Sequence, residues 1–184
     1  MESRSKGVPT MTTANKITIF RFILVPVLVV LMYLDHIYWA LAVFILASLS
    51  DTLDGYIARH YNQVSDFGKF MDPLADKVLV LSAMTMFVDW HAMPAWVLIL
   101  VLVREFAVSG LRLVAVDNGR VIAAARSGKI KTTVTMVGII LMMAIGIPQE
   151  ITWLNTIVWV LIAVTTLYSG AEYFIKNKDV LSFQ

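Results

Sequence analysis

Long apolar stretches separated by short polar turns dominate the hydropathy pattern of this chain. Six stretches are long enough to span a bilayer, judged against the about 20 residues that a transmembrane helix needs. They cover residues 17–34, 38–59, 70–88, 93–115, 130–147 and 152–175. The pattern therefore predicts an all-α integral membrane protein, built as a bundle of six transmembrane helices.

Basic residues are distributed unevenly between the predicted connectors. The turns around Asp35, Asp89 and Glu150 contain no Lys or Arg, whereas the 15 basic residues lie in the tails, the other two connectors and the adjoining helix halves. The positive-inside rule places these basic regions, and with them both termini, in the cytoplasm. An even number of spans also puts both termini on one side, so the two arguments agree.

Composition supports the membrane assignment and excludes some chemistry. Hydrophobic residues make up 59% of the 184 residues, against about 45–50% in a typical globular domain. The chain has no cysteine, which excludes disulfides, thiolate ligands and a cysteine nucleophile. We divide it into an N-terminal tail (1–14), whose first residues are either a flexible tail or an extension from cloning, a six-helix domain (15–176) and a C-terminal tail (177–184).

Four aspartates form two helical pairs in the middle of the sequence. Asp51 and Asp54 are three residues apart, and Asp72 and Asp76 are four apart, so each pair shares a helix face. Carboxylates within apolar helices are unfavourable unless they are paired, hydrated or metal-bound. Because hard carboxylate oxygens suit ions such as Mg²⁺ and Mn²⁺, the cluster predicts a divalent metal site.

The depth of these aspartates predicts a cavity rather than a pore. Counted from the external helix ends at about 1.5 Å per residue, Asp51, Asp54 and Asp76 lie about 18–24 Å into a core of about 30 Å. The predicted cavity therefore opens to the cytoplasm. Pro73 disfavours helical geometry at the preceding residue, so we expect Asp72 in or just before the first turn of the third helix.

The alternative to a metal site is a set of ion pairs between the aspartates and Arg59, Lys69 and Lys77. Four acids with interleaved glycines are more than three ion pairs require, which favours the metal. With no cysteine and His60 as the nearby histidine, the ligands do not suit zinc.

A second polar group lies on the cytoplasmic side of the predicted fourth and fifth helices. It contains Arg104, Arg112, Lys129 and Lys131, and such side chains suit the recognition of phosphate. Arg104 lies too deep to anchor at the membrane surface, and Glu105 is a possible ion-pair partner for it. For Lys129 and Lys131 the alternative is that they mark the inner membrane surface.

The aspartates belong to a longer spaced motif. It reads Asp51-x-x-Asp54-Gly55-x-x-Ala58-Arg59, then eight residues, then Gly68-x-x-x-Asp72-x-x-x-Asp76. This motif resembles the signature of the CDP-alcohol phosphatidyltransferases, six-helix membrane enzymes that transfer a phosphatidyl group from CDP-diacylglycerol to an alcohol and release CMP. The resemblance implies that all four aspartates hold Mg²⁺ or Mn²⁺, expected as two divalent ions, and that Asp76 is also the general base.

The resemblance also implies a binding site for the donor lipid. Its expected residues are Asn15, Thr18, Asp54, Gly55, Ala58, Arg59 and Gly68. Gly55 and Ala58 would leave room for the cytidine nucleotide, and Arg59 would brace a phosphate or a metal-binding acid. For Asn15 a helix N-cap is the alternative role.

Two shorter stretches, residues 15–21 and residues 103–112 with 128–132, resemble the bacterial phosphatidylglycerophosphate synthase branch of the family. This implies glycerol 3-phosphate as the acceptor, held by Arg104, Arg112, Lys129 and Lys131. It also implies a homodimer in the bacterial inner membrane, with membrane lipid but no nucleic acid as a partner. The alternatives are another acceptor (serine, inositol phosphate or phosphatidylglycerol), a divalent-cation transporter, or an inactive scaffold.

Overall fold

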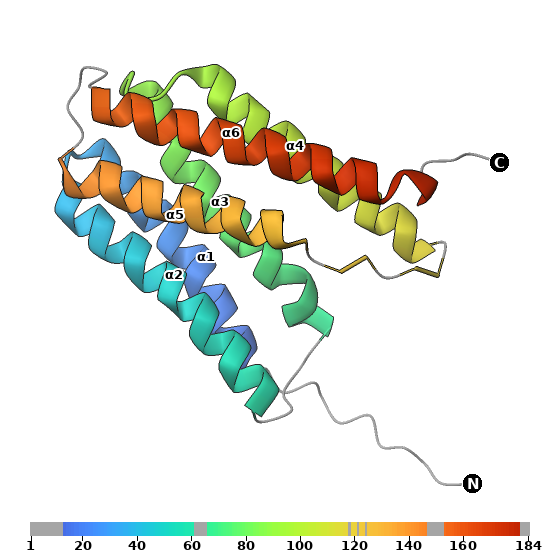
Figure 1. Ribbon diagram of the computed structural model, residues 1–184. Helices are drawn as coiled ribbons and strands as arrows, with labels where there is room; N and C mark the ends of the chain where they lie inside the picture. Colours follow the sequence, from blue (N-terminus) through green and yellow to red (C-terminus); the bar gives the residue numbers. More distant parts are fainter. Residues whose placement is uncertain are drawn as a thin grey trace, which may run out of the picture.

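The computed structural model describes residues 13–60, 66–117, 119–120, 122–123, 125–146 and 153–180, and their side chains except 13–16, 51–60, 66–70 and 179. This part of the chain is helical, without strands (Figure 1). The elements are α1 (Thr13–Tyr33), α2 (Ile37–His60), α3 (Asp66–Asp89), α4 (Ala95–Asp117), α5 (Arg126–Ala144), α6 (Trp153–Lys176) and the short 3-10 helix η1 (Lys178–Val180). The all-α prediction is confirmed, and each predicted range overlaps one helix.

Three helices begin four residues earlier than the hydropathy pattern predicts, and α1 is one of them, since it begins at Thr13 rather than at residue 17. Helix α5 begins at Arg126 rather than at residue 130, and α3 begins at Asp66 rather than at residue 70. The prediction that Asp72 lies in or before the first turn of its helix is therefore wrong, because Pro73 lies inside α3. Hydropathy marks where a helix becomes apolar, whereas backbone hydrogen bonding can continue into a polar extension. Helices of membrane proteins also tolerate proline in their interior.

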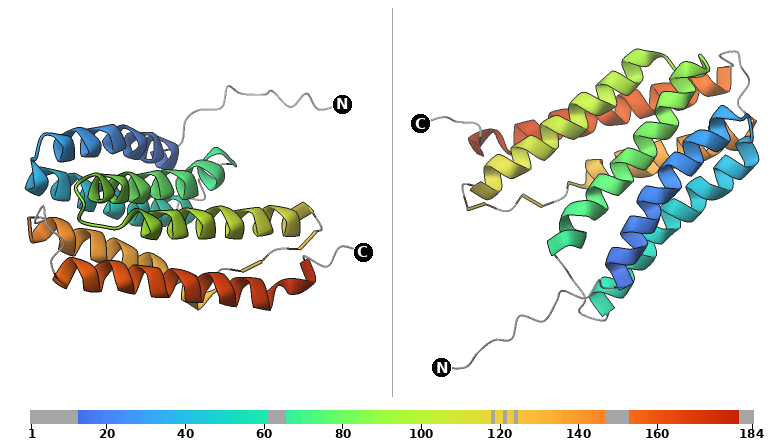
Figure 2. Two further views of the ribbon diagram at one scale, coloured as in Figure 1. Left: turned by 90° about the horizontal axis from the view of Figure 1, so that it is seen from above. Right: turned by 180° about the vertical axis from the view of Figure 1, so that it is seen from behind.

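The six helices close into a ring. Contacts run from α1 to α2, then to α5, α6, α4 and α3, and back to α1, while α3 also contacts α5 across the middle. Figures 1 and 2 show the helices alternating in direction, so that the starts of α1, α3 and α5 lie toward the ends of α2, α4 and α6. Side chains from distant parts of the sequence can therefore meet at this end, which we call the polar end.

The apolar core fills the opposite end of the bundle. Its fully buried members include Leu28, Phe44, Phe87 and Met142, from α1, α2, α3 and α5. At this end, α1 and α3 each stop in a tight turn with a left-handed residue, Asp35 or His91, so the next helix can reverse direction. A continuous apolar core at one end leaves the buried charges to gather at the other.

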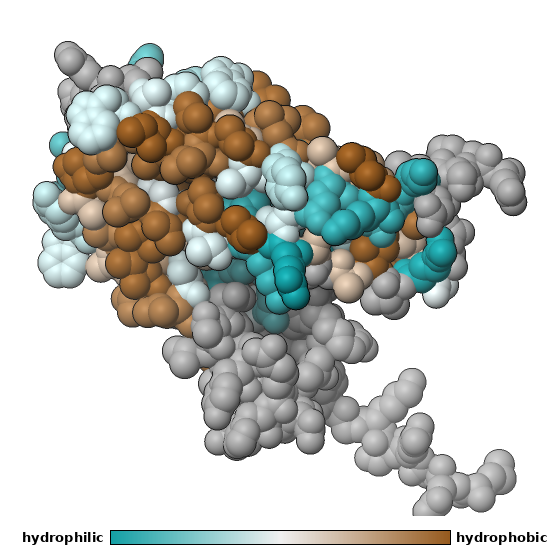
Figure 3. Space-filling view, in the orientation of Figure 1, coloured by the Kyte–Doolittle hydropathy of each residue, from teal (hydrophilic) through white to brown (hydrophobic). Residues whose placement is uncertain are grey.

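The outward faces of the helices are apolar. Along α1, Phe20, Ile23, Val27 and Val30 are all exposed, and their spacing of three and four residues forms a single stripe. Figure 3 shows apolar side chains over the end where α5 stops and α6 begins, and hydrophilic ones toward the polar end. Exposed apolar areas of this extent indicate a surface that contacts lipid or another protein.

Two of the helices are long and apolar enough to cross a membrane by length and composition within the described residues, namely α5 and α6. Shorter apolar runs occur at Ile17–Tyr33 in α1 and Ile37–Ser50 in α2. This agrees with a membrane-associated protein.

Candidate functional site

Helix α1 supplies partners to both aspartates of α3. The Thr18 hydroxyl donates to Oδ1 of Asp72 at 2.5 Å, and the guanidinium of Arg21 donates to Oδ1 of Asp76 at 3.1 Å. Thr18 and Arg21 are one helical turn apart, as are Asp72 and Asp76, so the two packed helices form two matching polar contacts. The predicted donor-site residue Thr18 therefore does lie beside the aspartate cluster.

Arg21 has a fully buried side chain, whereas 27% of the Asp76 side chain is exposed. A buried guanidinium is tolerated when its charge is matched by a nearby carboxylate, and this ion pair supplies that match. The exposed part of Asp76 faces a cavity. The carboxylate is therefore held from one side by α1 and remains accessible from the other.

The rest of the predicted metal and donor site lies outside the described side chains. The residues concerned are Asn15, Asp51, Asp54, Gly55, Ala58, Arg59 and Gly68. Their backbone lies on α1, α2 and α3. Helix α2 ends at His60, α3 begins at Asp66, and these two helices are in contact. The alternative role of Asn15 as a helix N-cap is wrong, because α1 already begins at Thr13 and Asn15 lies inside it.

Metal binding by the four aspartates stays a prediction. The described side chains contain no group of three or more metal-binding residues, but they include only Asp72 and Asp76 of the four. The donor set itself fits a hard divalent cation, because its members offer carboxylate oxygens and no sulfur.

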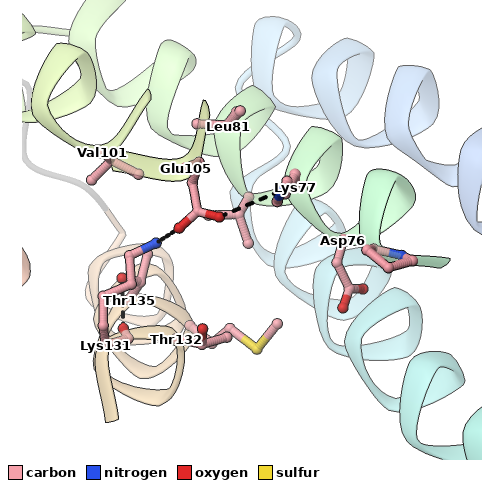
Figure 4. A pocket seen from close by; sticks show the side chains of 11 residues that line it. Asp76, Lys77, Leu81, Val101, Glu105, Lys131, Thr132 and Thr135 are labelled. Carbon is pink, nitrogen blue, oxygen red and sulfur yellow. Dashed lines mark hydrogen bonds and ion pairs between the residues drawn. The ribbon is translucent and has the colours of Figure 1, made fainter. Parts of the chain in front are cut away.

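A second charged cluster surrounds Glu105 on α4 (Figure 4). Oε1 of Glu105 accepts hydrogen bonds from Arg104 at 2.7 Å and from Lys131 at 2.8 Å. Figure 4 shows the second of these contacts. Its Oε2 atom lies 3.7 Å from Nζ of Lys77, and that ammonium donates to the Ser109 hydroxyl at 2.6 Å. One carboxylate thus connects cations from α3, α4 and α5.

The contacts of these basic residues distinguish between their alternative roles. Lys131 is 6% exposed and paired, so it does not mark the membrane surface, whereas Lys129 is exposed. Glu105 is indeed a partner of Arg104. The ion-pair alternative assigned Lys77 to the aspartates, but Lys77 pairs with Glu105. Among the described residues, Asp76 forms its ion pair with Arg21. Arg59 and Lys69 lie outside the described side chains.

Arg104 is enclosed between α5 and α6. Its NH2 group donates to the Ser169 hydroxyl at 2.6 Å. A Cβ atom added at Gly128 would lie 3.4 Å from this NH2 group, and one added at Gly170 would lie 3.4 Å from Cγ of Arg104. Small residues therefore make room for the guanidinium at the junction of three helices.

Arg112 lies one helical turn beyond Ser109 and is held by α6. Its Nε atom donates to the Tyr173 hydroxyl at 2.7 Å, and the guanidinium carbon lies 5.4 Å from the centre of the Tyr173 ring. This contact can orient the charge because the ring face attracts a cation.

Two cavities meet at this cluster. The smaller, of about 200 Å³, is lined by Asp76, Lys131 and Thr135 among others, and the larger, of about 430 Å³, by Arg104, Arg112 and Lys129 among others. Residues that line both are Pro73, Lys77, Glu105 and Thr132. The arrangement can hold an anion in the larger cavity beside a carboxylate that faces the smaller one.

The sequence motifs assign no role to Arg21 or Tyr173, and they assign Lys77 only an ion pair with the aspartates. An arginine inside the first apolar stretch, three residues after Thr18, was a signal for Arg21, because intramembrane charges need partners. For Lys77 the signal was its position beside Asp76. No sequence signal connected Tyr173 to Arg112, since they are 61 residues apart.

A helical bundle that places a carboxylate beside a basic cavity suits phosphoryl-transfer chemistry. Residues 11–168 match the sequence profile of the CDP-alcohol phosphatidyltransferases, and the chain belongs to this family.

Curated relatives agree with this assignment. The CDP-diacylglycerol–glycerol-3-phosphate 3-phosphatidyltransferase of Bacillus subtilis (strain 168) is 39% identical, over 91% of this chain and 95% of its own. The enzyme of the same name from Rickettsia typhi is 36% identical, over 87% and 93%. A probable phosphatidylglycerophosphate synthase of Mycobacterium tuberculosis (strain ATCC 25618 / H37Rv) is 37% identical, over 68% and 63%.

Proposed function

We propose that this protein transfers the phosphatidyl group of CDP-diacylglycerol to glycerol 3-phosphate, giving phosphatidylglycerophosphate and CMP. The observation that carries the proposal is the basic cavity beside Asp76, in a chain whose relatives are named for this reaction. A phosphorylated acceptor requires buried cations near the reacting carboxylate. A zwitterionic acceptor such as serine would need them less.

The reaction needs a proton acceptor next to the attacking hydroxyl. The primary hydroxyl oxygen of glycerol 3-phosphate attacks the phosphorus that bears the diacylglycerol, and the bond from this phosphorus to the CMP oxygen breaks. The electron pair of that bond leaves with CMP, and the hydroxyl proton moves to the Asp76 carboxylate. Arg21 holds this carboxylate through one oxygen, and the cavity gives the acceptor access to it.

Mg²⁺ or Mn²⁺, expected as two ions, would be held by Asp51, Asp54, Asp72 and Asp76. When bound, such ions neutralise the diphosphate of the donor and the charge that develops on the leaving CMP. Thr18 orients Asp72 through its hydroxyl, a contact of the kind that commonly fixes metal-binding carboxylates. Asn15, Gly55, Ala58, Arg59 and Gly68 would complete the site for the nucleotide.

We further propose that all six helices span the bacterial inner membrane, with the polar end and both termini in the cytoplasm. The charge-poor turns at the other end and the outward apolar stripes support this orientation. By resemblance to the family, we expect a homodimer.

The test is an acceptor panel with radiolabelled CDP-diacylglycerol and the purified full-length enzyme. We expect product with glycerol 3-phosphate and little with serine, inositol phosphate or phosphatidylglycerol, and no product after removal of divalent ions. The Asp76→Asn enzyme is the negative control, since it lacks the proton acceptor. A preference for another alcohol would overturn the acceptor, and metal flux into liposomes without CDP-diacylglycerol would instead favour a transporter.

A further inference from the structure

Lys77 lies between the two halves of the site. It follows Asp76 directly on α3, but the two side chains point in different directions, Lys77 toward Glu105 on α4 (Figure 4). Within the described residues it is the basic residue that lines both cavities. A ligand in the larger cavity can therefore contact Lys77 while it extends toward the smaller cavity and Asp76.

The ammonium of Lys77 is held less tightly than its neighbours. It has one hydrogen bond, to Ser109 at 2.6 Å, and its 3.7 Å distance from Glu105 is too long for a direct hydrogen bond. Its side chain is 33% exposed. Since an ammonium carries three donors, Lys77 retains donors for a bound anion.

Arg104 and Lys131 are committed to the fold instead. Their side chains are 11% and 6% exposed, and both donate to the same oxygen of Glu105 at less than 3 Å. Arg104 also donates to Ser169. Turning either cation toward a ligand would leave part of the Glu105 carboxylate buried without its partner, which is unfavourable.

The charges of the cluster match a phosphate dianion. Lys77, Arg104 and Lys131 carry three positive charges around the single negative charge of Glu105. The surplus of two positive charges equals the charge of a fully ionised phosphomonoester. Arg112 and Lys129 add to the positive potential of the larger cavity.

We infer that Lys77 is the residue that binds the acceptor phosphate closest to the reaction centre and so directs the acceptor hydroxyl to Asp76, while Glu105 with Arg104 and Lys131 holds the site in shape. This inference rests on the proposed function. On binding, the Lys77 ammonium exchanges its weak pairing with Glu105 for the phosphate oxygens. The three-carbon skeleton of glycerol 3-phosphate then extends from Lys77 toward the neighbouring carboxylate.

The test compares Lys77→Gln and Lys77→Arg with the wild type and with Lys176→Gln. Lys176 is an exposed residue that pairs with Glu172 on the same helix and lines neither cavity. We expect Lys77→Gln to raise the KM for glycerol 3-phosphate at least tenfold while the KM for CDP-diacylglycerol stays within twofold. Inhibition by inorganic phosphate should weaken in parallel, and Lys77→Arg should recover most of the affinity.

A binding measurement covers the case in which turnover is lost. Glycerol 3-phosphate should raise the melting temperature of the wild type and of Lys176→Gln, but not that of Lys77→Gln. An unchanged KM for glycerol 3-phosphate in Lys77→Gln, or equal changes in both KM values, would overturn the inference alone. A wild-type enzyme that selects a neutral acceptor would overturn it together with the acceptor assignment, so the two failures are distinguishable.

Discussion

Arg21 shows how a single buried charge can hold a carboxylate of the candidate site in place. Its side chain is fully buried, and it reaches Asp76 from a different helix, 55 residues away in sequence. The pair brings a positive charge beside Asp76, which shares a helix face with Asp72, and two carboxylates on one face would otherwise repel each other. Arg21 therefore acts on the site through Asp76 and needs no contact with substrate.

We predict that Arg21→Met lowers the free energy of unfolding in detergent by about 1–3 kcal/mol, because the Asp76 carboxylate loses a hydrogen-bonded partner. Turnover should fall as well, since Asp76 is no longer held in place. Thermal unfolding and initial rates of the purified enzyme measure both effects.

The double variant Arg21→Met/Asp76→Asn provides the control. If the ion pair is the cause, removing the carboxylate should restore part of the stability, with a coupling free energy of about 0.5–3 kcal/mol. Strictly additive losses would mean that Arg21 stabilises the fold through other contacts.

These residues also show how far a sequence can predict a site. Spacing along a helix made the Asp72 and Asp76 pair visible, because residues three or four apart share a face. The Arg112–Tyr173 and Arg104–Ser169 contacts, both between α4 and α6, join residues that are 61 and 65 positions apart. Such pairs depend on the helix packing order, which no local pattern specifies.

Helix packing in this bundle depends on small residues at particular crossings. The closest of the described approaches is at Gly138 on α5, where an added Cβ would lie 2.8 Å from Cγ1 of Val158 on α6. Gly110 on α4 is the opposite case, with no atom within 4 Å of an added Cβ. The number of helices could be predicted from the lengths of the apolar stretches. The helix crossings and the polar first turn of α5 could not, because hydropathy carries no information on which helices pack together.

We predict that Gly138→Ala lowers the free energy of unfolding by about 1–3 kcal/mol, the usual range for an overpacked core. Val158 is β-branched and buried, so it cannot rotate away easily. The matched control is Gly110→Ala, which should be neutral or stabilise by up to about 1 kcal/mol, since alanine is the better helix former.

Melting temperatures of both variants in the same detergent test this packing argument. Combining Gly138→Ala with Val158→Ala should recover part of the loss by making room for the new methyl group. Equal effects of the two glycine variants would show that helix propensity, rather than the α5–α6 crossing, determines the outcome.

The whole molecule separates an apolar end from a polar end. The fully buried apolar core lies toward the turns around Asp35 and His91, and the cavities lie where α3 and α5 begin. In the proposed function, this polarity would let charged substrates meet a membrane-bound lipid. The soluble acceptor would enter from the polar end, while the acyl chains of the donor would stay beside the outward apolar faces.

The proposed orientation predicts that His36 and Lys178 lie on opposite sides of the membrane. Both side chains are exposed, and five helices, α2 to α6, separate them. An odd number of spans must place them on different sides. The chain has no cysteine, so His36→Cys and Lys178→Cys each introduce a single reactive thiol into an otherwise thiol-free protein.

A membrane-impermeant maleimide should label Lys178→Cys in inverted vesicles and His36→Cys in right-side-out vesicles. Val27→Cys, on the apolar stripe of α1, should react from neither side, because thiols in lipid ionise poorly and the reagent cannot reach them. Labelling of both positions from the same side would require an even number of crossings between them. One of the five helices would then lie along the membrane or inside the protein, and the cavity could not open to the cytoplasm by the route proposed.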